Sequence, residues 1–322
     1  MTSNPDTNPF VRPDTRAFLD FLNAQDGPKM HELPAAVGRD MMKAMRVVGD
    51  AEPTPLAVIR DLSCPGPAGD IPLRLYDARE SREPGPVLVF FHGGGFVIGD
   101  LDTHEPFCTE AARILDIPVI AVDYRLAPEH VWPAAPDDCE AAARWIATSP
   151  AELGRSVTAL TVGGDSAGGN LAIVVAMALR DAPAAVPVIA QLPIYPATDM
   201  GSDHPSFTHF ADGYLLTRDS MEWFADCYAA DLTHQKASPI LFDQHGMPPA
   251  VVITASLDPI RDQGRAYVAA LAQAGVPVSY REAKGNIHGF ICLRKGIPSS
   301  AEDIDGLLHA FRRLLDELSA AA

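Results

Sequence analysis

A serine flanked by glycines, at residues 164–168, is the leading candidate for chemistry in this chain. The segment reads Gly-Asp-Ser-Ala-Gly and places Ser166 between an apolar run, Ala159–Val162, and a helical pattern, Ala167–Asp181. In a strand–turn–helix of this kind the turn is so tight that flanking glycines are needed to avoid crowding, and the serine hydroxyl is exposed. We therefore predict that Ser166 is a nucleophile.

The alternative interpretation of this turn is a phosphate-binding site at a helix N-terminus. The chain contains no Gly-x-x-x-x-Gly-Lys-Ser/Thr sequence, and the glycines that begin at Gly93 miss the third glycine of Gly-x-Gly-x-x-Gly, where Ile98 stands. Because neither nucleotide-binding motif is present, nucleophilic serine chemistry explains the turn better.

A second glycine-rich segment, His-Gly-Gly-Gly-Phe at residues 92–96, directly follows the apolar run Val87–Phe91. Without side chains in the way, the backbone N–H groups of such a loop can point into a cavity. In serine acyl transfer they stabilise the oxyanion together with the N–H of the residue after the nucleophile. The predicted oxyanion donors are Gly94, Gly95 and Ala167.

A nucleophilic serine in this context needs an acid and then a histidine later in the chain. His288 follows the last predicted strand, Val278–Tyr280, in a loop that reads Asn-Ile-His-Gly-Phe, whereas His309 lies on the polar side of the predicted final helix. We therefore predict His288 as the general base. The other downstream histidines are His204, His209, His234, His245 and His309.

Three aspartates are candidates for the acid. Asp258 follows the apolar run Ala250–Thr254 and precedes Pro259, which suits the first turn of a helix. Asp262 would lie one turn further into that helix, and Asp199 follows another apolar run. We predict Asp258, and the other two aspartates remain alternatives.

Eight short apolar runs alternate with helical patterns from about residue 54 onwards, which predicts an α/β fold with a mostly parallel sheet covered by helices. The helix predicted at Ala167–Asp181 is apolar on all sides, so it should be enclosed near the middle of the sheet. The predicted strands are Leu56–Ile59, Leu73–Tyr76, Val87–Phe91, Val119–Val122, Ala159–Val162, Val188–Leu192, Ala250–Thr254 and Val278–Tyr280.

Two segments fall outside this alternation. Residues 1–53 carry amphipathic stretches ahead of the first strand, and residues at about 200–240 insert an aromatic-rich stretch between two strands. Long insertions in compact domains commonly form lids or binding loops, and we expect that role here. The alternative is that both segments are additional core-packing helices.

Composition and charge exclude several classes of protein. With 322 residues, of which 47% are hydrophobic, the chain is globular rather than disordered. Its 42 acidic and 25 basic residues leave a net charge of −17, which disfavours nucleic acids and anionic membranes as partners. The N-terminus does not read as a signal peptide, and no apolar run approaches a membrane span. Five scattered cysteines indicate reduced thiols, so we predict a cytoplasmic location.

Four ordered motifs together carry a family resemblance: His-Gly-Gly-Gly-Phe, Gly-Asp-Ser-Ala-Gly-Gly, Asp-Pro-Ile-Arg-Asp and Asn-Ile-His-Gly-Phe. With Val-Asp-Tyr-Arg-Leu-Ala-Pro-Glu-His at residues 122–130, they make residues 54–322 resemble the bacterial hormone-sensitive-lipase-like esterases of the α/β-hydrolase fold. The resemblance implies an α/β-hydrolase catalytic domain at 54–322. It also implies a helical cap built from residues 1–53 and about 200–240.

The resemblance further implies hydrolysis of carboxylic esters, with Ser166 as nucleophile, His288 as base, Asp258 as orienting acid, and Gly94, Gly95 and Ala167 as oxyanion donors. Neither a metal nor an organic cofactor is expected. The partner is a small-molecule ester, without nucleic acid or membrane insertion, and the resemblance is compatible with a homodimer.

Aromatic and methionine residues of the predicted cap suggest a compact apolar pocket and hence short-to-medium acyl esters. Two alternatives to ester hydrolysis remain: the family resemblance also implies a small-molecule binding protein on an esterase scaffold, and the same triad could serve an amidase or peptidase. The predicted pocket residues are Met41, Met45, Phe96, Phe207, Tyr214, Leu215 and Trp223.

Overall fold

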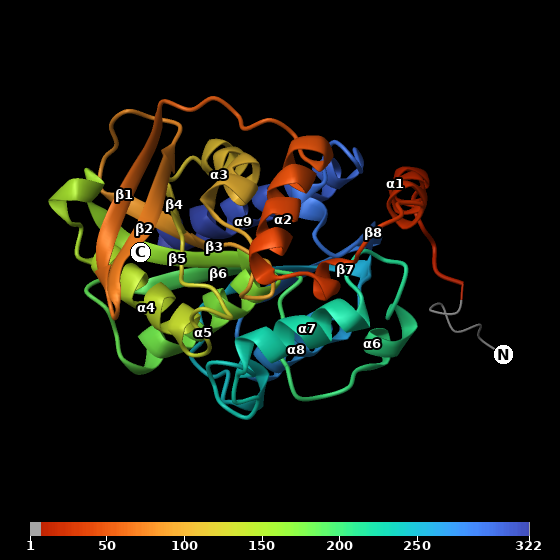
Figure 1. The fold of residues 1–322 in the computed structure, drawn as a ribbon. Helices are drawn as coiled ribbons and strands as arrows, with labels where there is room; N and C mark the ends of the chain where they lie inside the picture. The colour runs from red at the N-terminus through yellow and green to blue at the C-terminus, as the bar shows by residue number, and fades with distance from the viewer. Residues whose placement is uncertain (1–7, 322) are drawn as a thin grey trace.

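The sheet at the centre of the molecule has eight strands, one for each predicted apolar run (Figure 1). The computed structural model describes residues 8–321, so residues 1–7 of the predicted N-terminal segment and residue 322 of the predicted catalytic domain lie outside the described residues. The strands are β1 (Val58–Gly66), β2 (Gly69–Asp77), β3 (Gly85–Phe91), β4 (Val119–Val122), β5 (Val157–Asp165), β6 (Val188–Ile194), β7 (Ala250–Leu257) and β8 (Val278–Ile287).

The strand order across the sheet is β1-β2-β4-β3-β5-β6-β7-β8. β2 is antiparallel to both β1 and β4, whereas each neighbouring pair from β4 to β8 is parallel. The carboxyl ends of the parallel strands therefore meet at one edge of the sheet, which is where open α/β sheets bind ligands. This arrangement confirms the predicted mostly parallel α/β sheet.

Most strands are longer than the predicted runs, and the two edge strands differ from the prediction most. The first strand was expected at Leu56–Ile59, but β1 begins at Val58 and continues to Gly66, and β8 continues beyond Tyr280 to Ile287. Both are the outermost strands of the sheet and expose polar or charged side chains to solvent. A search for apolar runs therefore detects only part of each.

Helices cover both faces of the sheet. In β3, Val87, Val89 and Phe91 belong to one apolar cluster and Leu88 and Phe90 to the other, because successive side chains of a strand point to opposite faces. The first face is covered by α4 (Ala134–Ala147), α5 (Ala167–Asp181) and α8 (Arg261–Gln273), and the second by α3 (Leu101–Leu115) and α9 (Ser300–Ala321).

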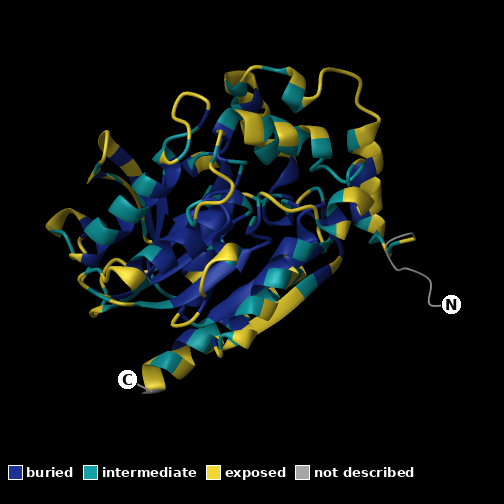
Figure 2. Ribbon diagram, turned by 90° about the horizontal axis from the view of Figure 1, so that it is seen from below, coloured by how far each residue is buried: buried dark blue, intermediate teal, exposed yellow. Residues whose placement is uncertain are grey.

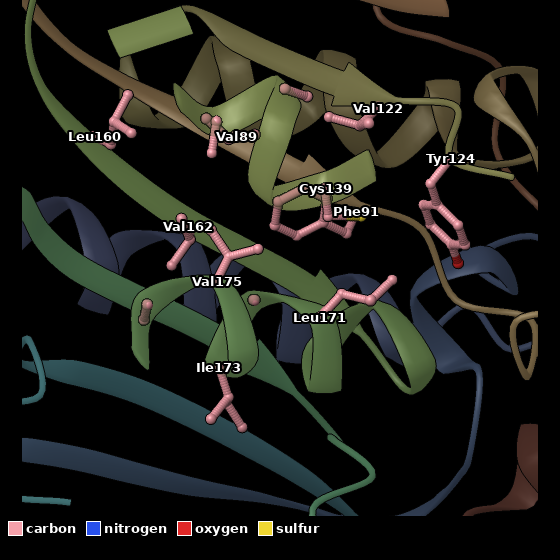
Figure 3. Close-up of a cluster of buried hydrophobic side chains, with 14 of the residues drawn as sticks. Val89, Phe91, Val122, Tyr124, Cys139, Leu160, Val162, Leu171, Ile173 and Val175 are labelled. Atoms are coloured by element: carbon pink, nitrogen blue, oxygen red, sulfur yellow. The ribbon is translucent and has the colours of Figure 1, made fainter. Parts of the chain in front are cut away.

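Burial decreases from the sheet outwards, and the outer faces of the helices are exposed (Figure 2). The helix α5 is the exception, because residues 167–177 are all buried. It packs on β5 and β6 and beside α4. In Figure 3, Leu171 and Val175 of this helix lie among strand side chains such as Val89 and Val162. This confirms that the all-apolar helix is enclosed, and it places the preceding turn near the centre of the fold.

The two segments outside the alternation form further helices, α1 (Pro13–Asn23) and α2 (Ala35–Gly49) before the sheet, and α6 (Pro205–His209) and α7 (Arg218–Tyr228) after β6. In Figure 1, α2 lies above α7 near the loops that follow β3. A Cβ on Gly38 of α2 would lie 3.6 Å from Trp223 Cη2 of α7, so the two segments are in contact. Short 3-10 turns occur at Met30–Glu32, Ala151–Leu153, Pro239–Leu241 and Phe290–Cys292.

Helix α2 is also attached to the carboxyl edge of the sheet. Arg39 donates hydrogen bonds to the carbonyl oxygens of Val97 (2.9 Å) and Ala127 (3.0 Å), which follow β3 and β4, and pairs with both carboxylate oxygens of Glu129. The N-terminal segment is thereby held next to the loop of residues 92–96. Among residues 8–321 no helix is both long and apolar enough to cross a membrane.

Candidate active site

Ser166 lies at the turn between β5 and α5 with a backbone conformation that serine rarely adopts, φ 56° and ψ −117°. The turn is fixed on both sides, because Ser166 N–H donates to the carbonyl oxygen of Ile194 at 2.9 Å and Ala197 N–H donates to that of Ser166 at 3.2 Å. A left-handed φ at a non-glycine residue costs free energy and persists only where the surroundings enforce it. The surroundings here are the ends of β5 and β6.

The glycines on either side of Ser166 are required by backbone contacts. A Cβ on Gly164 would overlap the carbonyl oxygens of Gly168 and Phe91, and a Cβ on Gly168 would overlap that of Phe91. Carbonyl oxygens at a strand end cannot move aside as a flexible side chain can. The Gly-x-Ser-x-Gly pattern therefore reflects the close approach of α5 to the end of β3.

We expect Gly168→Ala to destabilise the protein by about 3 kcal/mol, because the added methyl must displace the backbone of β3. The free energy of unfolding in urea measures the effect. Gly85→Ala is the matched control, since its Cβ would meet only the carbonyl oxygen of Glu83 at 3.8 Å. Equal free energies of unfolding for the two variants would contradict the close backbone packing at Gly168.

Ser166, His288 and Asp258 form a continuous chain of hydrogen bonds. Ser166 Oγ lies 2.8 Å from His288 Nε2, and His288 Nδ1 lies 2.7 Å from Asp258 Oδ2. His288 immediately follows β8 and Asp258 immediately follows β7, and these strands are neighbours. The structure thus brings together the three residues that the sequence predicts as a triad.

The carboxylate of Asp258 is fully buried, and its other oxygen accepts the backbone N–H of Ile260 at 2.9 Å. A carboxylate only accepts hydrogen bonds, so Nδ1 of His288 carries the proton and Nε2 has a free lone pair facing Ser166 Oγ. In this tautomer His288 can remove the hydroxyl proton of Ser166.

The two alternative acids lie elsewhere. Asp199 is 3.2 Å from His204 Nε2. Asp262 accepts the N–H of Ser206 at 3.0 Å and pairs with Arg261 at 2.8 Å. Both carboxylates therefore contact side chains or backbone of the segment after β6, or of the start of α8, and not His288.

The loop of residues 92–96 lies against the serine turn. Phe91 at the end of β3 is in register with Gly164 of β5, and Gly93 N–H donates to Asp165 Oδ1 at 2.7 Å. Gly94 and Gly95 have positive φ values of 120° and 59°. Within residues 8–321, no backbone or side-chain acceptor is bonded to the N–H of Gly94, Gly95 or Ala167. These three donors are available to an oxyanion.

The side chain of His92 makes structural contacts at the start of this loop. Its Nδ1–H donates to the carbonyl oxygen of Gly93 at 2.8 Å, and its ring stacks on Tyr124 with centroids 4.3 Å apart. Burial lowers the pKa of His92 to about 4, so the ring is neutral at neutral pH. Tyr124 also donates its hydroxyl to the carbonyl oxygen of His92 at 2.6 Å. These contacts fix the start of the loop.

Three of the predicted pocket residues belong to one apolar cluster. Met45, Tyr214 and Leu215 pack on a cluster that includes Ile287, the residue before His288. Leu215 has a φ of 74°, and its Cδ2 lies 3.8 Å from the Cβ position of Gly289. Leu215 therefore lies beside the predicted base, and Met45 and Tyr214 belong to the same apolar cluster.

The remaining pocket residues are at other sites. Phe96 is buried and stacks on Tyr228 with centroids 3.9 Å apart, and Trp223 packs on Gly38 of α2. The guanidinium of Arg218 lies 4.6 Å from the ring centre of Phe207. Met41 is 38% exposed. Their assignment to the pocket stays a prediction.

Three neighbours of the site were not predicted from the sequence. Tyr195, directly after β6, places its ring 4.6 Å from that of His288. Phe224 of α7 lies on Gly95, where a Cβ would overlap its ring. His104 of α3 lies 3.1 Å from Asp165. For Tyr195 the available signal was an aromatic residue near the end of a predicted strand. No local pattern distinguishes Phe224 or His104 from other residues of amphipathic helices.

No group of three or more His, Cys, Asp or Glu side chains suited to a metal ion occurs in the described part of the chain. The chemistry that the arrangement offers is nucleophilic: a serine with a base, an orienting carboxylate, and free N–H groups beside it.

Known proteins resemble this chain over most of its length. A family model described as α/β hydrolase fold matches residues 88–292. The carboxylic ester hydrolase LipN of Mycobacterium tuberculosis is 40% identical over 286 residues, which span 85% of this chain and 76% of LipN. The ethyl acetate hydrolase of Pseudomonas putida is 34% identical over 316 residues, which cover 95% of this chain and 99% of that protein.

A solved structure shares the whole architecture. The ester-hydrolase EH1AB1 from the metagenome of Lake Arreo, in complex with a derivative of bipyridine phosphonate, matches with a TM-score of 0.90 at 39% identity. The match covers 96% of this chain and 99% of that structure. Both the family match and the identities agree with the resemblance in the motifs. The chain therefore belongs to the α/β-hydrolase fold family, within its hormone-sensitive-lipase-like group.

Proposed function

We propose that this chain is a serine ester hydrolase in which Ser166 is the nucleophile, His288 the general base and Asp258 the acid that orients it. The observation that carries the proposal is the chain of hydrogen bonds from Ser166 Oγ through His288 to the buried carboxylate of Asp258. The relatives named ester hydrolase, esterase and ethyl acetate hydrolase support the ester as substrate.

In the first half of the reaction, Ser166 Oγ forms a bond to the ester carbonyl carbon while its proton passes to His288 Nε2. The carbonyl oxygen becomes an oxyanion, which the N–H groups of Gly94, Gly95 and Ala167 bind. The tetrahedral intermediate then expels the alcohol, which takes the proton from His288, and an acyl-enzyme remains.

In the second half, water attacks the acyl carbon and gives its proton to His288. The bond to Ser166 Oγ breaks, the oxygen takes back the proton from His288, and the carboxylic acid leaves. Asp258 keeps the histidine in the required tautomer throughout and stabilises the imidazolium that forms in each half. The scheme uses only groups of the chain and one water.

We infer that the preferred acyl chains are short to medium in length, because side chains of the predicted cap cover the site. The ring of Phe224 rests on Gly95, and Leu215 lies beside Gly289, the residue after His288. Both come from the insertion at about 200–240, so this insertion and the helices of residues 8–53 would form the cap. A bulky ring on the oxyanion loop limits the space for an extended acyl chain.

Hydrolysis of p-nitrophenyl acetate, butyrate, octanoate and palmitate tests the proposal. We expect kcat/KM to be highest for acetate or butyrate and lowest for palmitate. Palmitate as the best substrate would contradict the acyl range. No turnover of any ester by the folded protein would contradict ester hydrolysis itself.

Phe224→Ala should move the preference towards longer chains. Removal of the ring frees space beside Gly95, so we expect the ratio of kcat/KM for octanoate to that for butyrate to rise about tenfold. Phe242→Ala is the control, because Phe242 is a partly exposed aromatic residue outside α7. An unchanged ratio in the folded Phe224→Ala protein would show that this ring does not limit the acyl chain.

The proposal also includes the cellular location and the oligomeric state of the enzyme. A cytoplasmic location is supported by the five cysteines, which are all free thiols in the structure. A homodimer stays a prediction that derives from the family resemblance, and sedimentation velocity of the purified protein tests it.

A further inference from the structure

A second histidine–aspartate pair lies directly behind the serine turn. His104 of α3 and Asp165, the residue before Ser166, are 1% and 4% exposed. His104 Nε2 is 3.1 Å from Asp165 Oδ1, in a contact that is electrostatic rather than a well-aligned hydrogen bond. The reaction scheme above uses neither side chain, so a buried ionic contact next to the nucleophile needs another explanation.

Asp165 connects this pair to the oxyanion loop. The same oxygen, Oδ1, accepts the N–H of Gly93 at 2.7 Å, and a Cβ on Gly93 would overlap the Asp165 carboxylate. Gly93 is adjacent to the predicted donors Gly94 and Gly95, so its position sets where their N–H groups point. The other oxygen, Oδ2, is 3.4 Å from the hydroxyl of Tyr195, whose ring packs on His288.

The charges of the pair stabilise each other. Burial by itself would raise the pKa of Asp165, but His104 and the Gly93 N–H outweigh it and hold that pKa below its ordinary value. Burial would lower the pKa of His104, but Cys292 and Asp165 raise it well above the ordinary value. Both shifts favour the charged form of the partner concerned. Removal of one partner leaves a buried charge without compensation.

The orientation of His104 is also constrained. Its Nδ1 lies 3.0 Å from Thr103 Oγ1, and its ring centre lies 5.5 Å from that of His92. Thr103 belongs to the first turn of α3, where its N–H is bonded to Asp100. The imidazole thus links the start of α3, the base of the loop at residues 92–96 and the serine turn.

We propose that His104 and Asp165 act as a unit that positions the oxyanion donors of ester hydrolysis by holding Gly93 in place; the inference rests on the function proposed above. His104 is a positioning residue and touches neither substrate nor Ser166. Oxyanion donors contribute mainly in the transition state, so their misplacement lowers kcat while KM changes little.

The test uses His104→Phe and Asp165→Asn, singly and combined, with p-nitrophenyl butyrate as substrate. Turnover is expressed per active site titrated with a p-nitrophenyl phosphonate, so that loss of folded protein does not count as loss of kcat. We expect His104→Phe to lower kcat by about 10²-fold, the cost of one oxyanion donor, with KM within about threefold. The double variant should be no worse than the poorer single variant, because the two residues act as a unit.

His309→Phe, an exposed histidine of α9, is the control and should leave kcat unchanged. If His104→Phe does not fold, His104→Gln, which keeps a neutral donor of similar size, takes its place, with a smaller loss of kcat expected. Additive effects of the two substitutions, or a loss confined to KM, would overturn the proposal.

Inhibition by a butyl trifluoromethyl ketone gives a second readout. Ser166 Oγ adds to the ketone carbon and its proton passes to His288, so the hemiketal that forms would place an oxyanion at the donors, and the inhibition constant should rise by the same factor as kcat falls. An unchanged inhibition constant in folded His104→Phe overturns the positioning role. Failure of the proposed function is distinguishable, because it would appear in the other proteins: no ester turnover by the folded wild type, or activity that survives in Ser166→Ala.

Discussion

Replacement of Ser166 by alanine is expected to lower kcat for p-nitrophenyl butyrate by about 10⁶-fold, the loss seen when a serine nucleophile is removed from an intact triad. Ser166 Oγ is the atom that forms the acyl bond, and the hydroxyl that His288 can deprotonate lies 2.8 Å from its Nε2. Residual turnover would come from the oxyanion donors and from substrate binding alone.

The folded state of Ser166→Ala is checked by circular dichroism and by its thermal unfolding midpoint. The substitution removes one hydroxyl and changes the conformational cost of the positive φ at residue 166 only slightly. We therefore expect a thermal unfolding midpoint near that of the wild type. Ser63→Ala, at an exposed position of β1, is the matched control and should keep full activity. Substantial turnover by Ser166→Ala would assign the chemistry to another residue.

The same measurement on His288→Ala tests whether the residues work together. Nucleophile and base act in one step, so the loss in the double variant Ser166→Ala/His288→Ala should equal that of either single variant. Multiplied losses would show that His288 contributes independently of Ser166. His204→Ala is the control, because its imidazole pairs with Asp199 and not with Asp258.

Asp258→Asn is the second large effect, with an expected decrease of about 10⁴-fold in kcat. An amide in this position can donate a hydrogen bond to His288 Nδ1, which then leaves the proton on Nε2. In that tautomer His288 cannot accept the proton of Ser166. The buried position of Asp258, and the bond from Ile260 N–H to its other oxygen, leave the side chain little freedom to turn.

Asp199→Asn separates this tautomer effect from the loss of any carboxylate near the site. Asp199 also follows a strand of the sheet, and it was an alternative acid on sequence grounds. We expect its substitution to change kcat by less than about threefold, since no group of the triad touches it. Comparable losses in the two variants would mean that Asp258 is not the orienting acid.

The predictions that succeeded from sequence depend on short-range patterns. Runs such as Val87–Phe91 mark strands that are covered on both faces, and the all-apolar stretch of α5 marks an enclosed helix. The two outer strands were located only in part, because one of their faces meets solvent and carries polar side chains. A hydrophobic pattern detects buried residues, so it does not locate those parts of a strand that are exposed to solvent.

The turn at Ser166 could be predicted from sequence alone, because strand, turn and helix are contiguous and the glycines on both sides have a steric cause. The histidine followed from its place after the last strand. For the acid, residue types left Asp199, Asp258 and Asp262 as candidates. The strand order favours Asp258, because β7 and β8 are neighbours and the residues after their carboxyl ends meet.

Tertiary structure alone brought Phe224 onto Gly95, Tyr195 onto His288, and His104 next to Asp165. Each contact joins residues from elements that are distant in the chain, and a local pattern carries information only about a residue's own helix or strand. The sequence by itself determined most of the elements and their order, and it predicted the chemistry at Ser166. Which side chains surround that chemistry was decided by the order of the strands, because that order determines which loops share the carboxyl edge.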